Sequence, residues 1–175
     1  MARPGVLPEG VSVTPLTTHR DPRGGLAELL RSNAIQGPQP VQWIVSESER
    51  NAFRGVHVHV QHWDYLFVLQ GELLLGLHDM RPTSLTYRRS ATVTLRGSDL
   101  RAVVIPPGVA HGFYYPERTL HLLGTSTYWD RRDDLACRWD APELGIEWPC
   151  ADPILSPRDR DAGGYAEMAA QLGRQ

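Results

Sequence analysis

Short stretches rich in apolar, β-branched and aromatic residues follow one another along the chain from residue 41 to residue 129. Several of them alternate apolar and polar positions, and the breaks between them are short and contain Gly, Pro, Asp or Ser. This pattern predicts β-strands joined by tight turns. The predicted strands cover residues 41–47, 55–60, 65–70, 72–79, 84–89, 91–95, 101–106, 111–115 and 119–129. Many short strands at this spacing are typical of a β-sandwich or β-barrel.

Helical periodicity is scarce in this chain. Residues 25–30 (GLAELL) form a short apolar run that fits either a strand or a single turn. Residues 165–172 (YAEMAAQL) predict a helix, because they are rich in helix formers and follow a pair of glycines. From about Trp139 onward Pro and Asp become frequent, so we expect the C-terminal segment to wrap the barrel as loops.

The chain has 175 residues, which is close to the size of one domain, and contains no internal repeat, linker or low-complexity tract. Apolar residues make up 41% of it, enough for one sizeable core. We therefore predict a single all-β domain over residues 1–175. Its expected parts are an N-terminal strand arm at about 1–35, a barrel at about 36–130, and a wrapping C-terminal segment with a helix at 131–175.

Charge and hydropathy argue against two classes of partner. The formal net charge of −2 gives no bulk attraction to nucleic acid or to anionic lipid. The N-terminus lacks the apolar core of a signal peptide, and no apolar run approaches the ~18 residues of a membrane span. We therefore expect a cytoplasmic protein with neither a nucleic-acid nor a membrane partner.

The basic residues are of one kind: all 18 are arginine, and the chain contains no lysine. No step can therefore use a lysine amine as a base or to form a Schiff base, whereas arginine suits bidentate binding of phosphate. The two cysteines, Cys137 and Cys150, match no zinc-binding spacing and make no disulfide framework.

Chemistry-bearing residues concentrate in residues 54–71, RGVHVHVQHWDYLFVLQG. Alternate side chains of a strand share a face, so His57 and His59 are expected to point one way and the intervening valines the other. Asp64 begins the next predicted strand, whereas His62 is expected to face away from the pair, toward the surface. Two interpretations are open at this point: these residues hold a metal ion, or one histidine is a catalytic base without a metal.

The spacing of these residues matches two known motifs. The first is His57-x-His59, then Asp64 and Gly71; the second is Pro106-x-Gly108-x-x-His111. Together they resemble the two signature motifs of the cupin superfamily, with aspartate where the first motif has glutamate. The resemblance implies a jelly-roll β-barrel, a fold that keeps these positions even where no metal binds. His78 and His121 are expected to be structural.

Five further segments resemble a narrower family, the dTDP-4-dehydrorhamnose 3,5-epimerases. In chain order they are DPRGGLAE (21–28), FRGVH (53–57), IPPGVAHGF (105–113), RWDAPELGIEWP (138–149) and LSPRD (155–159). The resemblance runs from about residue 10 to residue 162, and five ordered motifs are more specific than the cupin signature alone.

The family resemblance implies a homodimer that exchanges N-terminal strands and acts on dTDP-4-keto-6-deoxyhexoses in antibiotic or polysaccharide biosynthesis. A base removes the proton next to the C4 ketone, at C3, C5 or both, and an acid returns it on the opposite face without a metal. The ketone acidifies these carbons, and the enolate oxygen that forms needs electrostatic support.

The resemblance also implies roles for single residues. His57 would be the base, since histidine titrates near neutral pH, and Asp159 would be its carboxylate partner. Substrate-binding roles are implied for Arg23, Glu28, Arg54, His111 and Arg158. The arginines would hold the diphosphate or the sugar, and Glu28 would contact the nucleotide.

Two family positions differ in this chain. The lysine that supports the enolate corresponds to Asp64, whose negative charge would oppose enolate formation. The tyrosine acid, counted without gaps from the AHGF segment, corresponds to Gly124, which is expected to leave a hole where the ring would stand. Tyr114, Tyr115 and Tyr128 are candidate replacements, and Tyr128 is expected on the same strand face as Gly124.

These differences keep two alternatives open beside the epimerase. One is a metal-dependent cupin enzyme, an oxygenase or lyase, with one divalent transition metal on His57, His59, Asp64 and His111. The other is a catalytically silent module that binds a nucleotide sugar.

Overall fold

The computed structural model describes residues 6–174 and contains mainly strands. The strands are β1 Ser12–Pro15, β2 Thr18–Asp21, β3 Gly24–Ala27, β4 Gln42–Ser48, β5 Phe53–His59, β6 Asp64–Gln70, β7 Glu72–Asp79, β8 Ser90–Arg96, β9 Arg101–Ile105, β10 Val109–Tyr114, β11 Thr119–Thr125 and β12 Asp134–Ala136. The helical elements are η1 Pro142–Leu144, α1 Pro157–Arg160 and α2 Tyr165–Leu172. No helix within residues 6–174 has the length and apolar character needed to cross a membrane.

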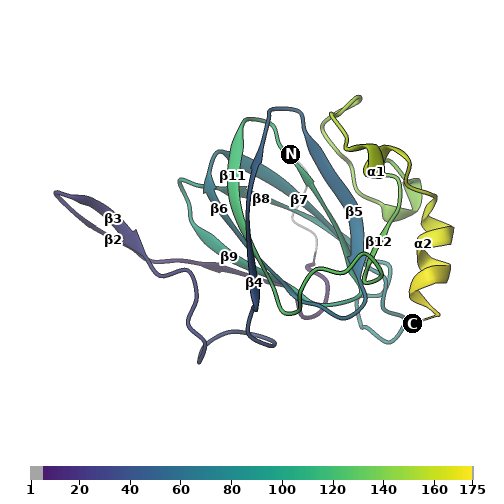
Figure 1. The fold of residues 1–175 in the computed structure, drawn as a ribbon, viewed down its shortest axis with the longest axis horizontal. Coiled ribbons are helices and arrows are strands. Elements are labelled where there is room, and N and C mark those ends of the chain that lie inside the picture. The colour runs from purple at the N-terminus through teal and green to yellow at the C-terminus, as the bar shows by residue number, and fades with distance from the viewer. Residues whose placement is uncertain (1–5, 175) are drawn as a thin grey trace.

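Two five-stranded antiparallel sheets enclose the interior (Figure 1). The first has the strand order β1-β9-β6-β11-β4, and the second has the order β12-β5-β10-β7-β8. Strands far apart in sequence are neighbours in both sheets, as in the pairs β1–β9 of the first and β5–β12 of the second, which is the connectivity of a jelly roll. The prediction of an all-β jelly-roll barrel with a short C-terminal helix is therefore confirmed.

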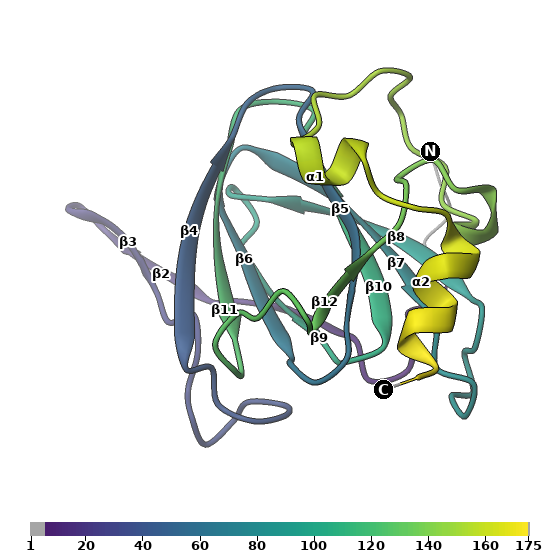
Figure 2. The same ribbon diagram turned by 45° about the vertical axis from the view of Figure 1, so that its right-hand side comes forward.

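The alternation of side chains on β5 decides which residues reach the barrel interior. Val56 and Val58 are fully buried in the apolar layer beneath the C-terminal segment, where they join Leu144 and Met168. Figure 2 shows α2 lying against this outer side of the second sheet, whereas α1 lies near one end of β5, where its residues line the cavity. Since the valines face outward, the intervening histidines face the space between the sheets, as predicted from strand alternation.

Two glycines allow backbone approaches that shape this region. Gly71 closes the turn between β6 and β7 with φ 79°, and a Cβ there would collide with the backbone carbonyl of Arg118. Gly55 in β5 has φ 112°, and a Cβ would lie 2.9 Å from the carbonyl oxygen of His111. This close approach lets His57 pair directly with His111 across β5 and β10.

Most predicted strands are present, but the one at residues 84–89 is wrong. These residues form turns between β7 and β8, because the hydroxyls of Ser84 and Thr86 each donate a 2.6 Å hydrogen bond to Asp79 Oδ2. Such local side-chain hydrogen bonds compete with a strand ladder, and they leave Leu85 exposed.

The predicted N-terminal arm divides into two parts. Strand β1 belongs to the first sheet beside β9, whereas β2 and β3 pair only with each other and project from the barrel as a hairpin (Figure 1). The run at residues 25–30 therefore begins as a strand. Residues 1–5 of the predicted arm lie outside the described part of the chain.

Candidate active site

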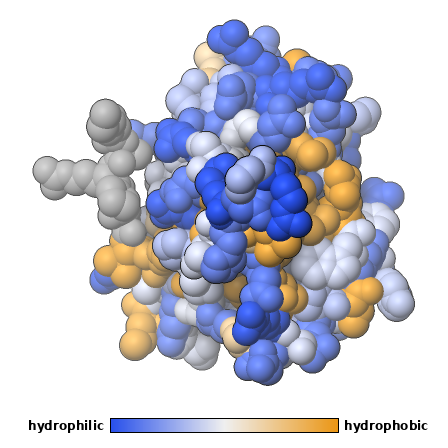
Figure 3. All heavy atoms as spheres, turned by 90° about the vertical axis from the view of Figure 1, so that its left-hand side faces the viewer, coloured by the Kyte–Doolittle hydropathy of each residue, from blue (hydrophilic) through white to orange (hydrophobic). Residues whose placement is uncertain are grey.

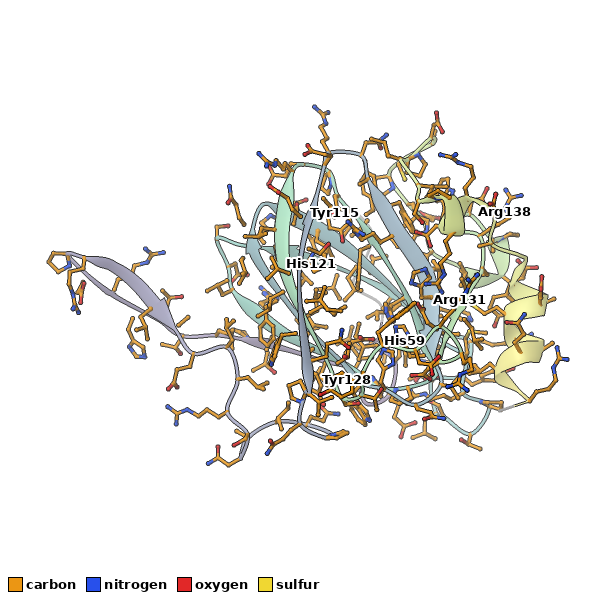
Figure 4. All side chains as sticks on the ribbon, viewed as in Figure 1. His59, Tyr115, His121, Tyr128, Arg131 and Arg138 are labelled. Carbon is orange, nitrogen blue, oxygen red and sulfur yellow. The ribbon has the colours of Figure 1, made fainter. Side chains whose placement is uncertain are left out.

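A cavity of about 350 Å³ lies between the two sheets and is closed on one side by the C-terminal segment. Its walls come from β4 and β11 of the first sheet and from β5 and β10 of the second. His59 of β5 and His121 of β11, both labelled in Figure 4, lie on opposite walls. The volume is within the range of about 300–1,000 Å³ that is typical of small-molecule sites.

His57 and Asp159 meet in this cavity although 102 positions separate them in sequence. The ring nitrogen Nε2 of His57 lies 2.7 Å from Asp159 Oδ1. Ser156 caps the N-terminus of α1: its hydroxyl accepts from the Asp159 backbone N–H at 3.1 Å and donates to Asp159 Oδ2 at 2.9 Å. A short capped helix therefore aims Asp159 at the histidine.

The charge state of Asp159 follows from its surroundings. Burial opposes ionisation, but the hydrogen bonds from His57 and Ser156 and the charge of His57 hold the pKa of Asp159 below its usual value. The carboxylate is thus ionised at neutral pH and able to hold the imidazole in one orientation. This is the geometry of a positioned general base.

Asp134, which the sequence analysis did not identify, links His57 to its neighbour His59. Its Oδ1 lies 3.6 Å from Nδ1 of each histidine, because β12 pairs with β5 at this point. Its Oδ2 accepts from Arg158 Nη1 at 2.5 Å and from Trp129 Nε1 at 3.0 Å. Although burial opposes ionisation, the bond from Arg158 and the nearby histidines hold the pKa of Asp134 well below its usual value. Asp134 ends the charged stretch 130–134 and begins a strand of only three residues, so no sequence pattern identified this carboxylate.

A second polar group lies beside the first and consists of His59, His62, Asp64 and His111, which we call the imidazole cluster. Nε2 of His59 lies 3.4 Å from Asp64 Oδ2, Nε2 of His111 lies 3.6 Å from the same oxygen, and Nε2 of His62 lies 3.6 Å from Asp64 Oδ1. All four residues are buried.

The prediction that His62 faces the surface is wrong. His62 is 1% exposed, and its ring stacks on that of His59 with 3.8 Å between the ring centroids. Its Nδ1 lies 2.5 Å from Asp133 Oδ2. Strand β5 ends at His59, so strand alternation no longer applies at residue 62, and the turn brings the ring back over the strand end.

Burial and charge act differently on the members of the imidazole cluster. Burial lowers the pKa of His59 to about 4 and also lowers that of His111. Burial opposes protonation of His62 too, but Asp64 and Asp133 raise its pKa above the usual value. Although burial favours the neutral acid, the surrounding imidazoles hold the pKa of Asp64 below its usual value.

Of the residues given substrate-binding roles, three line the cavity: Arg54, His111 and Arg158. Arg54 Nε donates to Ser48 Oγ at 3.0 Å, which holds the guanidinium at the cavity wall. Arg23 and Glu28 do not line this cavity. Arg23 pairs with Asp21 on the projecting hairpin, and Glu28 pairs with Arg31 beyond it.

The expected positions of the missing tyrosine are both outside the cavity. On β11 the cavity is lined by His121, Leu123 and Thr125, so Gly124 faces the opposite side, where a Cβ would lie 2.8 Å from the Trp43 ring. The expectation of an unfilled hole at Gly124 is therefore wrong. Tyr128 lies beyond the end of β11 and is 76% exposed (Figure 4), so the expected shared strand face does not exist.

The facing sheets define a cupin-type jelly roll, and the cavity between them holds a histidine–aspartate pair. Residues 7–167 match the sequence profile of dTDP-4-dehydrorhamnose 3,5-epimerase. The chain belongs to this family, as its motifs indicated.

Individual relatives agree with the family assignment. The chain is 34% identical over 170 residues to the dTDP-4-dehydrorhamnose 3-epimerase of Streptomyces niveus, a match that covers 91% of this chain and 81% of the relative. It is 30% identical over 156 residues to the dTDP-4-dehydrorhamnose 3,5-epimerase of Pseudomonas aeruginosa, which covers 84% and 86% of the two chains. Among solved structures, it resembles NovW, a 4-keto-6-deoxy sugar epimerase from the novobiocin gene cluster of Streptomyces spheroides, with a TM-score of 0.86, 28% identity and coverage of 97% and 89%.

Proposed function

We propose that this protein epimerises a dTDP-linked 4-keto-6-deoxy sugar at a carbon next to the ketone. The observation that carries the proposal is the 2.7 Å contact between His57 and Asp159 inside the cavity of a chain that belongs to this family. Relatives named as 3-epimerases and as 3,5-epimerases support the substrate class.

The residues of the cavity have distinct parts in this reaction. With Nε2 of His57 bonded to Asp159, the other ring nitrogen, Nδ1, is the atom that takes the proton from carbon. Asp159 on one side and Asp134 on the other then complement the positive charge of the protonated ring. Arg54 and Arg158, which line the same cavity, are the groups for the diphosphate. We propose that this proton transfer uses side chains and no cofactor.

Exchange with heavy water tests the proposal directly. The protein is incubated in D₂O with a dTDP-4-keto-6-deoxyhexose, and NMR follows deuterium at C3 and C5. Deuterium should enter at one or both carbons with the wild-type protein and not with His57→Asn. His78→Gln is the matched control, because His78 is a buried histidine outside the cavity, bonded to Ser90 and Tyr165. Tight dTDP binding without any exchange would instead identify a silent binding module.

We further propose that two copies form a homodimer through the hairpin and the outer face of β4. The hairpin residue Leu26 is 66% exposed, and Trp43 and Val45 on the edge strand β4 are exposed as well. Figure 3 shows this side of the molecule, with apolar residues beside the hydrophilic hairpin. In such a dimer the hairpin would carry Arg23 and Glu28 toward the cavity of the second copy, consistent with their family roles.

Sedimentation equilibrium tests the dimer. The wild-type protein should have the mass of two chains, and Leu26→Asp should shift the equilibrium toward one chain. Leu85→Asp is the matched control, because Leu85 is also an exposed leucine, 87% against 66% for Leu26, but lies in the β7–β8 connection. A wild-type monomer at micromolar concentration would contradict the proposal. A cytoplasmic location stays a prediction.

A further inference from the structure

The imidazole cluster has the geometry of a metal site. The ligand atoms offered by His59, His62 and Asp64 all lie within 4.8 Å of one another. The three Nε2 atoms of the cluster lie 3.4–3.6 Å from the Asp64 carboxylate oxygens. Ligands held tetrahedrally at about 2.1 Å from one ion are about 3.4 Å apart, which is close to these histidine–Asp64 distances. The rings of His59 and His62 are stacked, and His111 lies outside the group of ligand atoms within 4.8 Å of one another, so the rings would have to turn for all four donors to meet one ion.

The outer nitrogens of two of the three rings lie at hydrogen-bond distance from acceptors. Nδ1 of His62 lies 2.5 Å from Asp133 Oδ2, and Nδ1 of His111 lies 3.2 Å from the carbonyl oxygen of Val109. Nδ1 of His59 lies 3.6 Å from Asp134 Oδ1 and makes no hydrogen bond. An acceptor at Nδ1 holds the proton there and leaves the Nε2 lone pair free, which is the arrangement found around metal-binding histidines.

This arrangement is unfavourable without a cation. With the ring protons on Nδ1, three Nε2 lone pairs would face the negatively charged Asp64. Asp64 Oδ1 and His59 Nδ1 have no hydrogen-bond partner, although both atoms are buried. Among the described residues the ion-pair contacts of Asp64 are with histidines alone, so no arginine supplies the missing charge.

We propose that His59, His62 and Asp64, with His111 as the fourth donor, bind one divalent transition-metal ion of the imidazole-preferring kind, such as Zn²⁺. His57 is outside this set, because its Nε2 is bonded to Asp159. The site therefore differs from the expected set of His57, His59, Asp64 and His111 by the exchange of His57 for His62. A bound ion would supply positive charge to the cavity of a chain that has no lysine.

Metal binding is measured on the full chain after removal of metals with EDTA and dialysis. Zn²⁺ is titrated calorimetrically, and Co²⁺ is titrated by visible absorption, which reports the ligand field directly. The wild-type chain should bind one ion of either metal, with a Co²⁺ spectrum typical of four-coordinate nitrogen and oxygen ligands. If neither ion shows saturable binding at micromolar concentration and pH 7.5, the proposal is overturned. The positive charge beside Asp64 would then come from protonated histidine.

Single substitutions separate the two candidate ligand sets. His62→Gln should weaken Zn²⁺ binding by more than the roughly 10–100-fold that loss of an outer hydrogen-bond partner costs. His57→Asn should bind Zn²⁺ as the wild type does, and so should the control His78→Gln. Loss of binding in His57→Asn with retention in His62→Gln would overturn the assignment.

Two further measurements keep the proposal open to refutation. If His62→Gln does not fold, by near-ultraviolet circular dichroism, Asp133→Asn replaces it, because that change leaves all four donors in place and should lower affinity by about 10–100-fold. An unchanged affinity in Asp133→Asn would then count against His62 as a ligand. The site does not depend on the proposed epimerase activity: His57→Asn should lose exchange and keep the metal.

Discussion

His57 and His59 lie two positions apart on one face of β5, yet their surroundings differ. His57 Nε2 has a partner at 2.7 Å in Asp159, whose other oxygen is satisfied by Ser156. His59 is more deeply buried, its Nδ1 has no hydrogen bond, and its Nε2 faces Asp64 at 3.4 Å. The strand sets the direction of both rings, but the partners supplied by other segments set their chemistry.

The difference teaches which function each histidine suits. A ring held by a satisfied carboxylate keeps one nitrogen free for a proton from substrate, so His57 suits acid–base catalysis. A buried ring that lies among other imidazoles and beside an incompletely paired carboxylate fits the metal-binding role that we propose for His59. Asp134 lies between the two and contacts both rings.

The largest expected effect comes from the partner of His57. Asp159→Asn should lower the rate of deuterium exchange on the order of 10²- to 10⁴-fold, because the amide neither holds the required tautomer nor stabilises the protonated ring. Asp161→Asn is the control, since Asp161 is an exposed carboxylate at the end of the same helix. Equal exchange rates in the two variants would remove the basis of the comparison, because His57 would then not depend on its partner.

The next effect concerns the carboxylate shared by both histidines. Arg158→Met should lower the free energy of unfolding by about 2–4 kcal/mol, because Asp134 would stay buried without its guanidinium. Urea denaturation in the presence of EDTA measures this change. Arg138→Met is the matched control: Arg138 pairs with Asp140 at the exposed surface (Figure 4), where loss of an ion pair costs at most about 1 kcal/mol. Similar losses in both variants would mean that Asp134 does not depend on Arg158.

His121 separates the effect of burial from the effect of a carboxylate. Like His59, it is buried. Burial, followed by the positive charge of Arg54, lowers the pKa of His121 to about 4, and no carboxylate is among the causes. A histidine that is neutral in the folded state and has its ordinary value of 6.5 in the unfolded state stabilises the fold above pH 6.5. This contribution is lost as the pH falls toward 4.

The wild-type protein should therefore lose about 2–3 kcal/mol more than His121→Leu between pH 7 and pH 4.5, as measured by urea denaturation at each pH. The aspartates with lowered pKa values lose their contributions only below about pH 4, so they do not enter this interval. Parallel losses in the two proteins would show that burial does not keep His121 neutral.

Local sequence patterns predicted the strands well where packing follows alternation. β7 has the predicted bounds of 72–79, and α2 has the predicted bounds of 165–172. The strand at 84–89 was wrong because hydroxyl hydrogen bonds to Asp79, not hydrophobicity, decide that segment. Alternation predicts which way a side chain points inside a strand and predicts nothing once the strand has ended.

The candidate site was less predictable, because several of its residues lie beyond strand ends or come from distant segments, where alternation gives no information. The pairing of His57 with Asp159 was available only from the motif resemblance, since no local pattern joins residues so far apart. His62 lies just beyond the end of β5, and Asp134 lies in a strand of three residues, so neither had a usable pattern. The tyrosine position was assigned to Gly124 only by counting without gaps, and on β11 the residues that line the cavity are His121, Leu123 and Thr125.

The smallest effect tests the rule of alternation on which the comparison of His57 and His59 depends. Gly124→Tyr should leave dTDP affinity unchanged, because the new ring would meet Trp43 and Pro40 on the side away from the cavity. It should lower the free energy of unfolding by about 1–3 kcal/mol through overpacking. Leu123→Tyr, one position earlier, should lower dTDP affinity, because its ring would occupy the cavity. Calorimetric titration with dTDP measures both variants. Faster deuterium exchange in Gly124→Tyr would mean that the side chain at residue 124 reaches the substrate. The assignment of His121, Leu123 and Thr125 to the cavity side of β11 would then be wrong.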